Sequence, residues 1–189
     1  MAIPSLPDAE RLLASFELPH GIVVHARGVS RVAAEAARLL ATAGVAVDPQ
    51  LVEVAALLHD IDKLETRDDG AQHGVVGARW LVERGYAELA EPVASHPINC
   101  LLDEARAPRG WPSVIVAVAD RHVAQRFVSI DERIDDMAQR YPRYRASLEL
   151  ARAPAHAMEA QLAAAAGMAT DQLVRRLRAA WDAAEPGAS

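Results

Sequence analysis

The sequence predicts an all-α protein folded as one helical domain. Apolar residues recur at the three- and four-residue spacing of amphipathic helices along most of the chain, and no segment alternates apolar and polar residues like a half-buried strand. The 189 residues, 51% of them hydrophobic, suffice for one sizeable core. We expect a single domain over residues 1–189, with its core over about 20–142 and C-terminal helices over about 143–184.

The first two predicted helices have clear end signals. Val24–Ala43 is amphipathic, and Gly44 is placed to end it. Asp48 and Pro49 then have the pattern of an N-cap followed by a first-turn proline, which predicts a second helix through about Asp60.

The next predicted helices end at glycine and proline. Gln72–Arg84 is expected to form a helix closed by Gly85, and Glu88–His96 a short one stopped by Pro97. After a loop, Pro112 opens an apolar helix that is expected to reach about Phe127.

Ser129–Glu132 has the pattern of a capping box, which predicts a helix ending near Tyr141 and Pro142. Two alanine-rich helices are expected to follow. They are Arg143–Ala166, with a break near Pro154, and Asp171–Ala184, before a frayed tail over Glu185–Ser189.

Composition excludes several classes of protein. A net charge of −6 and a pI near 5.6 argue against a dedicated binder of long nucleic acid. The one cysteine, Cys100, excludes a disulfide framework and a cysteine-rich zinc site. There is no secretory signal pattern and no apolar run of about 18 residues that would span a membrane. We therefore expect a cytoplasmic protein.

Two predicted helices place a carboxylate at the end of an apolar run. Leu51–Leu58 leads directly into His59 and Asp60, and Val114–Ala119 leads directly into Asp120. A buried carboxylate costs several kcal/mol unless it is paired or bound to a metal. A cation shared by the two aspartates would explain both positions.

His25, near the start of the first helix, completes a candidate metal site with His59, Asp60 and Asp120. This mixture of imidazoles and carboxylates suits Mn²⁺, Fe²⁺, Co²⁺, Ni²⁺ or Zn²⁺ better than Ca²⁺ or Mg²⁺. His73 and His96, also at predicted helix ends, are candidate ligands of a second ion bridged by Asp60.

The order of these residues resembles the H…HD…D pattern of the HD-domain superfamily of metal-dependent phosphohydrolases. The segment Ala-Ala-Leu-Leu-His59-Asp60-Ile-Asp-Lys63 is similar to the family's LLHDIGK motif, and the segment from His73 to Ala78 to the HGxxGA motif of its small dinuclear members. The chain departs from the pattern at Asp62, where the family has Gly or Ala, and at Arg121, where Lys is common.

The resemblance implies a small bacterial HDIG-type hydrolase that acts on a nucleotide or another small phosphate ester or anhydride. It implies one or two divalent ions, Mn²⁺ or Fe²⁺ first, with Asp60 orienting the nucleophile and Lys63 and Arg121 contacting phosphate. A solvated surface cation is the alternative for Lys63.

Two other functions stay open. A branch of the same superfamily uses these ligand types to hold two irons and activate O₂, and a catalytically silent domain would bind a nucleotide and regulate a partner.

The expected partner is a small phosphorylated substrate. The C-terminal helices either cover the site or form a homodimer contact, and His122 either lines the site or lies at the surface.

Overall fold

The computed structural model describes residues 3–67 and 72–183. Within these ranges the chain forms nine α-helices and three short 3₁₀ helices, and its only β-pairing is an isolated bridge between Val123 and Phe127. The all-α prediction is confirmed. The α-helices are α1 (Leu6–Ala14), α2 (His20–Thr42), α3 (Pro49–Leu57), α4 (Val75–Glu83), α5 (Ala90–Ser95), α6 (Gly110–His122), α7 (Ile130–Arg140), α8 (Arg145–Ala165) and α9 (Thr170–Asp182), and the 3₁₀ helices are η1 (Ala87–Leu89), η2 (Ile98–Leu102) and η3 (Pro142–Tyr144).

The helix starts predicted from capping residues agree with the structure. The Asp48 side chain accepts a hydrogen bond from the backbone N–H of Gln50 at 2.9 Å, so it caps α3. Ser129 and Glu132 form the reciprocal capping box of α7: the Glu132 N–H donates to Ser129 Oγ at 3.1 Å, and the Ser129 N–H donates to Glu132 Oε2 at 2.7 Å.

Other helix boundaries differ from the predictions. The sequence pattern predicts no helix over the segment that forms α1, which is capped by Ser5. Helix α6 ends at His122 rather than Phe127, because the chain turns back there and the Val128 N–H donates to the His122 carbonyl at 2.8 Å. The predicted end at Ala184 and the tail over Glu185–Ser189 lie outside the described residues.

The predicted break near Pro154 is wrong, because α8 runs without interruption through this residue. An internal proline removes one backbone hydrogen bond and crowds the preceding turn. Ala151 and Ala155, on either side of Pro154, are buried in a small cluster with side chains of α7. This packing offsets the cost of the proline and keeps the helix continuous.

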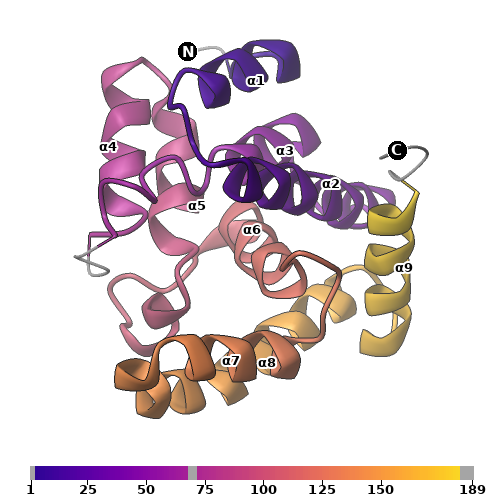
Figure 1. Ribbon diagram of the computed structural model, residues 1–189. Coiled ribbons are helices and arrows are strands. Elements are labelled where there is room, and N and C mark those ends of the chain that lie inside the picture. Colours follow the sequence, from indigo (N-terminus) through magenta and orange to yellow (C-terminus); the bar gives the residue numbers. More distant parts are fainter. Residues whose placement is uncertain (1–2, 68–71, 184–189) are drawn as a thin grey trace.

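Helices α2, α3 and α6 form the centre of the molecule (Figure 1). Helix α6 is buried over ten consecutive residues, Ser113–His122, and α2 packs against α3 on one side and α9 on another. Helices α4 and α5 pair beside this centre, and α7 and α8 lie side by side along its lower edge in Figure 1. In the described part of the chain, no helix is long and apolar enough to cross a membrane.

Helix α9 is attached to α2 by two specific contacts. Arg176 Nη2 lies 2.8 Å from the carboxylate of Glu35, a buried residue of α2. The Trp181 ring covers Gly28 so closely that a Cβ added to Gly28 would lie 2.1 Å from a ring carbon. A glycine at position 28 therefore lets the C-terminal helix pack onto the helix that carries His25.

We expect Gly28→Ala to destabilise the protein by about 1–3 kcal/mol, the usual cost of overpacking a filled interface. Thermal unfolding measures this loss. Gly21→Ala in the same helix is the control, because its nearest neighbour would be 3.9 Å away and alanine should stabilise the helix by about 0.5–1 kcal/mol. An unchanged melting temperature for Gly28→Ala would contradict the tight packing of Trp181.

Candidate metal centre

Three central helices bring the first four candidate ligands together. His25 lies in the second turn of α2, His59 and Asp60 follow the end of α3, and Asp120 lies in the last turn of α6. All four residues are buried. The helices bury their apolar faces against one another, so their polar ends are left to meet inside the protein.

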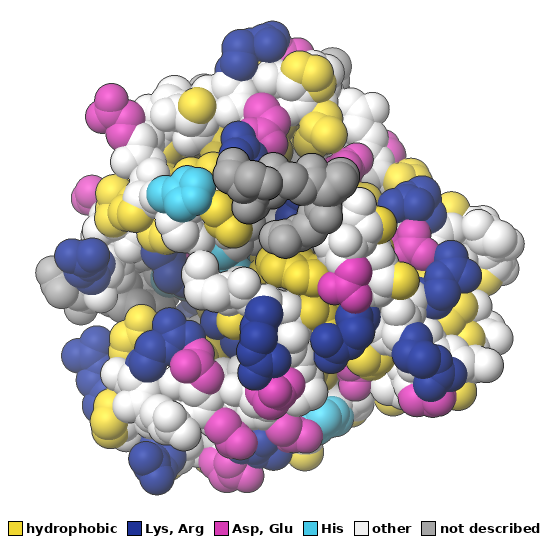
Figure 2. All heavy atoms as spheres, turned by 45° about the vertical axis from the view of Figure 1, so that its right-hand side comes forward, with side chains coloured by type: hydrophobic (Ala, Val, Ile, Leu, Met, Phe, Trp, Pro, Cys, Tyr) yellow, Lys and Arg dark blue, Asp and Glu magenta, His cyan; other side chains and the backbone are white. Residues whose placement is uncertain are grey.

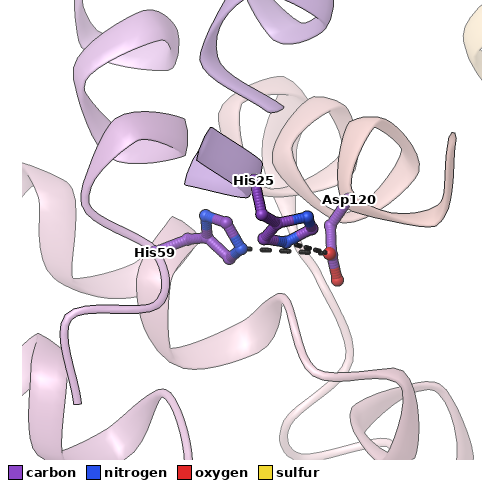
Figure 3. Close-up of side chains that lie close together, drawn as sticks. All are labelled: His25, His59 and Asp120. Carbon is purple, nitrogen blue, oxygen red and sulfur yellow. Dashed lines mark ion pairs between the residues drawn. The ribbon is translucent and has the colours of Figure 1, made fainter. Parts of the chain in front are cut away.

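The first triad consists of His25, His59 and Asp120 (Figure 3). His25 Nε2 lies 3.1 Å from Asp120 Oδ1, and His59 Nε2 lies 3.8 Å from the same oxygen. Asp60 Oδ2 faces this triad, at 3.8 Å from His25 Nε2 and 3.6 Å from His59 Nε2. The structure thus brings together the four side chains that the sequence predicted to converge.

The other oxygen of Asp60 faces His73 and His96. Asp60 Oδ1 lies 3.1 Å from His73 Nε2 and 3.6 Å from His96 Nε2, and these two nitrogens are 3.2 Å apart. His59, Asp60 and His96 form a second group whose ligand atoms all lie within 4.8 Å of one another. One carboxylate therefore faces two sets of imidazoles, one with each oxygen.

The donor atoms fit a divalent transition metal. His59 Nδ1 lies 2.7 Å from the Ala56 carbonyl, so it carries the proton and leaves the lone pair on Nε2. Among the described residues, this buried Nε2 has no hydrogen-bond partner. Burial lowers the pKa of His59 to about 3, which keeps the ring neutral, as a metal ligand must be. A cation in the cluster would satisfy this nitrogen.

The two aspartates are held in the ionised form. Burial alone would raise the pKa of each carboxyl, but their neighbours outweigh it and hold both pKa values well below the ordinary range. The main favourable neighbour is Lys63 for Asp60 and Arg121 for Asp120. The site is therefore built to hold two negative charges inside the protein.

Lys63 lies beside the second set of imidazoles. Its Nζ is 3.2 Å from Asp60 Oδ1 and 3.2 Å from His73 Nε2, while the side chain remains 44% exposed. It thus touches the cluster and can still be reached from solvent.

Arg121 has surroundings that differ from those expected of a phosphate-binding group. Its guanidinium is buried, forms an ion pair with Asp120 and donates to the His96 carbonyl at 2.6 Å. These contacts connect two candidate ligands from different elements. The geometry favours a positioning role for Arg121 over a direct contact with substrate.

Arg133 also lies beside the candidate metal ligands, although no sequence pattern predicted it there. It comes from α7, and its Nη2 lies 3.5 Å from Asp120 Oδ1, with 15% of the side chain exposed. The turn after α6 brings it to the site, and its only sequence signal is its place in the first turns of the helix opened by Ser129. The cluster therefore has a cation on each side, Lys63 near Asp60 and Arg133 near Asp120.

His122 does not lie at the surface. It is buried, with Nε2 2.7 Å from Glu159 Oε1 and Nδ1 2.9 Å from the Val128 carbonyl. Both ring nitrogens are thus engaged with groups outside the His/Asp cluster. His122 ties α6 to α8.

The fold and the cluster define an all-helical domain with a buried His/Asp centre able to hold a divalent metal. The sequence model of the HD domain family matches residues 22–125, a segment that includes all the candidate ligands. The chain belongs to the HD domain family, which consists generally of metal-dependent phosphohydrolases.

The similarity to a known relative covers only part of both sequences. Over 86 residues, 46% of this chain, the sequence is 37% identical to an uncharacterized protein of Methanocaldococcus jannaschii, and the match spans 50% of that relative's length. No solved structure matches the chain significantly.

Proposed function

We propose that the protein is a metal-dependent phosphohydrolase acting on a nucleotide or another small phosphate ester or anhydride. The observation that carries the proposal is the placement of Asp60, whose two oxygens face two separate sets of imidazoles while Lys63 and Arg133 approach from either side. A phosphoryl group needs cationic partners for its oxygens, and this arrangement offers them within one site.

The proposed ligands of one ion are His25, His59, Asp60 and Asp120, and those of a second ion are His73, His96 and Asp60. Mn²⁺ or Fe²⁺ suits this donor set best, with Co²⁺, Ni²⁺ and Zn²⁺ as further candidates. Bound ions would lower the pKa of water toward neutrality and draw charge from the phosphoryl oxygens.

The other residues bind and orient. Lys63, a compact and partly exposed ammonium, is suited to contact a phosphate oxygen as a point charge. Arg133 offers a planar fork for a second contact on the Asp120 side. Arg121 holds the Asp120 carboxylate and the His96 backbone in place from inside the protein.

The test is metal analysis of the purified protein, followed by phosphate release from a panel of nucleotides, phosphomonoesters and phosphoanhydrides with Mn²⁺. We expect release with and without O₂. Turnover that requires iron and consumes O₂ would instead favour the oxygenase branch. Nucleotide binding without turnover of any substrate in the panel would favour a regulator, and either result would overturn the hydrolase proposal.

We expect Arg133→Met to raise KM by about 10- to 100-fold, because one charge-assisted hydrogen bond to the substrate phosphate is lost. Metal content should not change, since the guanidinium is not a proposed ligand. Arg140→Met, also in α7 but on an exposed side chain paired with Asp136, is the matched control and should leave KM unchanged. Equal KM values for both variants would remove Arg133 from the substrate site.

A further inference from the structure

Asp62 is a fully buried carboxylate at the position where the resembling family has a glycine or alanine. It lies two residues after Asp60, and its side chain contacts His73 and the backbone at the start of α4. Its two oxygens have different partners, and the division between them suggests what the residue does.

One oxygen of Asp62 caps helix α4. Oδ2 accepts hydrogen bonds from the backbone N–H groups of Gly74 and Gly77, both at 2.8 Å. Gly74, the N-cap residue, has a positive φ of 81° and carries no capping side chain of its own. A Cβ at Gly77 would lie 3.2 Å from Ile61 Cγ1 and 3.4 Å from the Asp62 carboxylate, so a glycine at position 77 lets this segment approach the helix start closely.

The other oxygen holds His73. Asp62 Oδ1 lies 2.8 Å from His73 Nδ1. At this distance the oxygen accepts a hydrogen bond from Nδ1, which therefore carries the proton. Nε2 then keeps its lone pair, which faces the Lys63 ammonium, a pure hydrogen-bond donor 3.2 Å away, and Asp60 Oδ1 lies 3.1 Å from the same nitrogen.

The imidazoles of His59 and His96 are held in the same Nδ1–H tautomer by backbone carbonyls, which are weaker acceptors than a carboxylate. His59 Nδ1 and His96 Nδ1 each lie 2.7 Å from a backbone carbonyl, of Ala56 and Val93 respectively. At His73, which precedes α4, the partner of Nδ1 is instead the carboxylate of Asp62. A carboxylate from the neighbouring segment takes that place and makes the ring a better electron donor.

We propose that Asp62 is a positioning residue: it fixes His73 as the Nδ1–H tautomer, and so holds Nε2 ready to bind the second metal ion of the site. The metal part of this inference rests on the proposed function, whereas the tautomer part concerns the protein alone. Asp62, which departs from the family's motif, would thus orient one metal ligand, His73.

Asp62→Asn tests this role with little change in shape. The asparagine oxygen can keep both bonds to the start of α4, while its NH₂ group would face His73 Nδ1 and favour the Nε2–H tautomer, which cannot bind metal through Nε2. We expect the affinity for the second Mn²⁺ per chain to fall about 10–100-fold, with the first unaffected. The melting temperature of the metal-free protein should stay close to that of the parent. Asp48→Asn, which changes the cap of α3 alone, is the matched control and should alter neither Mn²⁺ affinity.

The tautomer is read directly from imidazole ¹⁵N shifts of the metal-free protein at about pH 9, above the ordinary titration range of histidine. We expect His73 to carry its proton on Nδ1 in the parent and on Nε2 in Asp62→Asn. A parent protein with the proton on Nε2 would overturn the proposal even if the variant failed to fold. So would a variant that kept the parent tautomer and both Mn²⁺ affinities.

The two proposals fail in different ways. Absence of phosphate release, with two Mn²⁺ bound and the tautomer switched as expected, would refute the hydrolase and leave the role of Asp62 intact. Normal hydrolysis with an unswitched tautomer would do the reverse.

Discussion

Asp60→Ala should remove bound metal from both proposed positions and reduce phosphate release by more than about 100-fold, the upper loss seen when only a supporting partner of a metal ligand is removed. The reason is geometric, because among the residues that the structure describes Asp60 is the carboxylate whose oxygens face both sets of imidazoles. Elemental analysis and phosphate release measure the two effects. Asp171→Ala, an exposed aspartate of α9, is the control and should behave as the parent.

The same variant also tests the electrostatics of the metal-free site. From the sequence alone, repulsion between Asp60 and Asp120 predicts that Asp60→Ala stabilises the metal-free protein. The structure reverses this expectation, because Lys63 and the imidazoles around Asp60 hold its pKa well below the ordinary value. A carboxyl whose pKa is lowered on folding contributes stability above its unfolded-state pKa. We therefore expect a lower melting temperature in chelator at neutral pH, and a higher one would contradict this account.

Most of the helical framework could be predicted because its signals are local. The caps at Asp48 and Ser129 act within three residues of sequence, and both helices begin where those residues predict. The errors arose where packing decides. Pro154 is kept inside α8 by buried alanines on either side, and α6 stops at His122 because the chain turns back there through a bond from Val128.

The residues of the site also fall into those with a local sequence signal and those placed by tertiary packing. The candidate ligands could be found because each is a polar residue at the end of an apolar run or in a recognisable motif. Arg133 could not, since it lies thirteen positions after Asp120 and beyond a reversal of the chain. Arg121 has the expected charge, but its burial and its bonds to Asp120 and the His96 carbonyl turn that charge inward. The sequence shows which charged side chains are present, whereas tertiary packing determines whether each one faces the cluster or the protein interior.

Lys63→Met should lower kcat by about 100-fold or more, the loss expected when one preorganised donor to a developing negative charge is removed. Lys63 Nζ lies 3.2 Å from Asp60 Oδ1, and its side chain is 44% exposed. Metal content should stay that of the parent, because an ammonium is not a ligand. With Mn²⁺ bound, the melting temperature should change little, because the ion would replace Lys63 as the cationic partner of the buried Asp60 carboxylate.

Lys63→Arg should recover part of the loss, because it restores the charge but places a longer, planar group near the phosphate. Chemistry offers an independent check, since Lys63 is the single lysine among the 20 basic residues of the sequence. Reductive methylation would therefore modify only this side chain and the terminal amine. If Lys63 contacts the phosphate, a bound phosphorylated substrate should protect it from methylation. Unchanged kinetics in Lys63→Met, together with methylation that substrate does not slow, would mean that Lys63 is a solvated cation paired with Asp60 and His73.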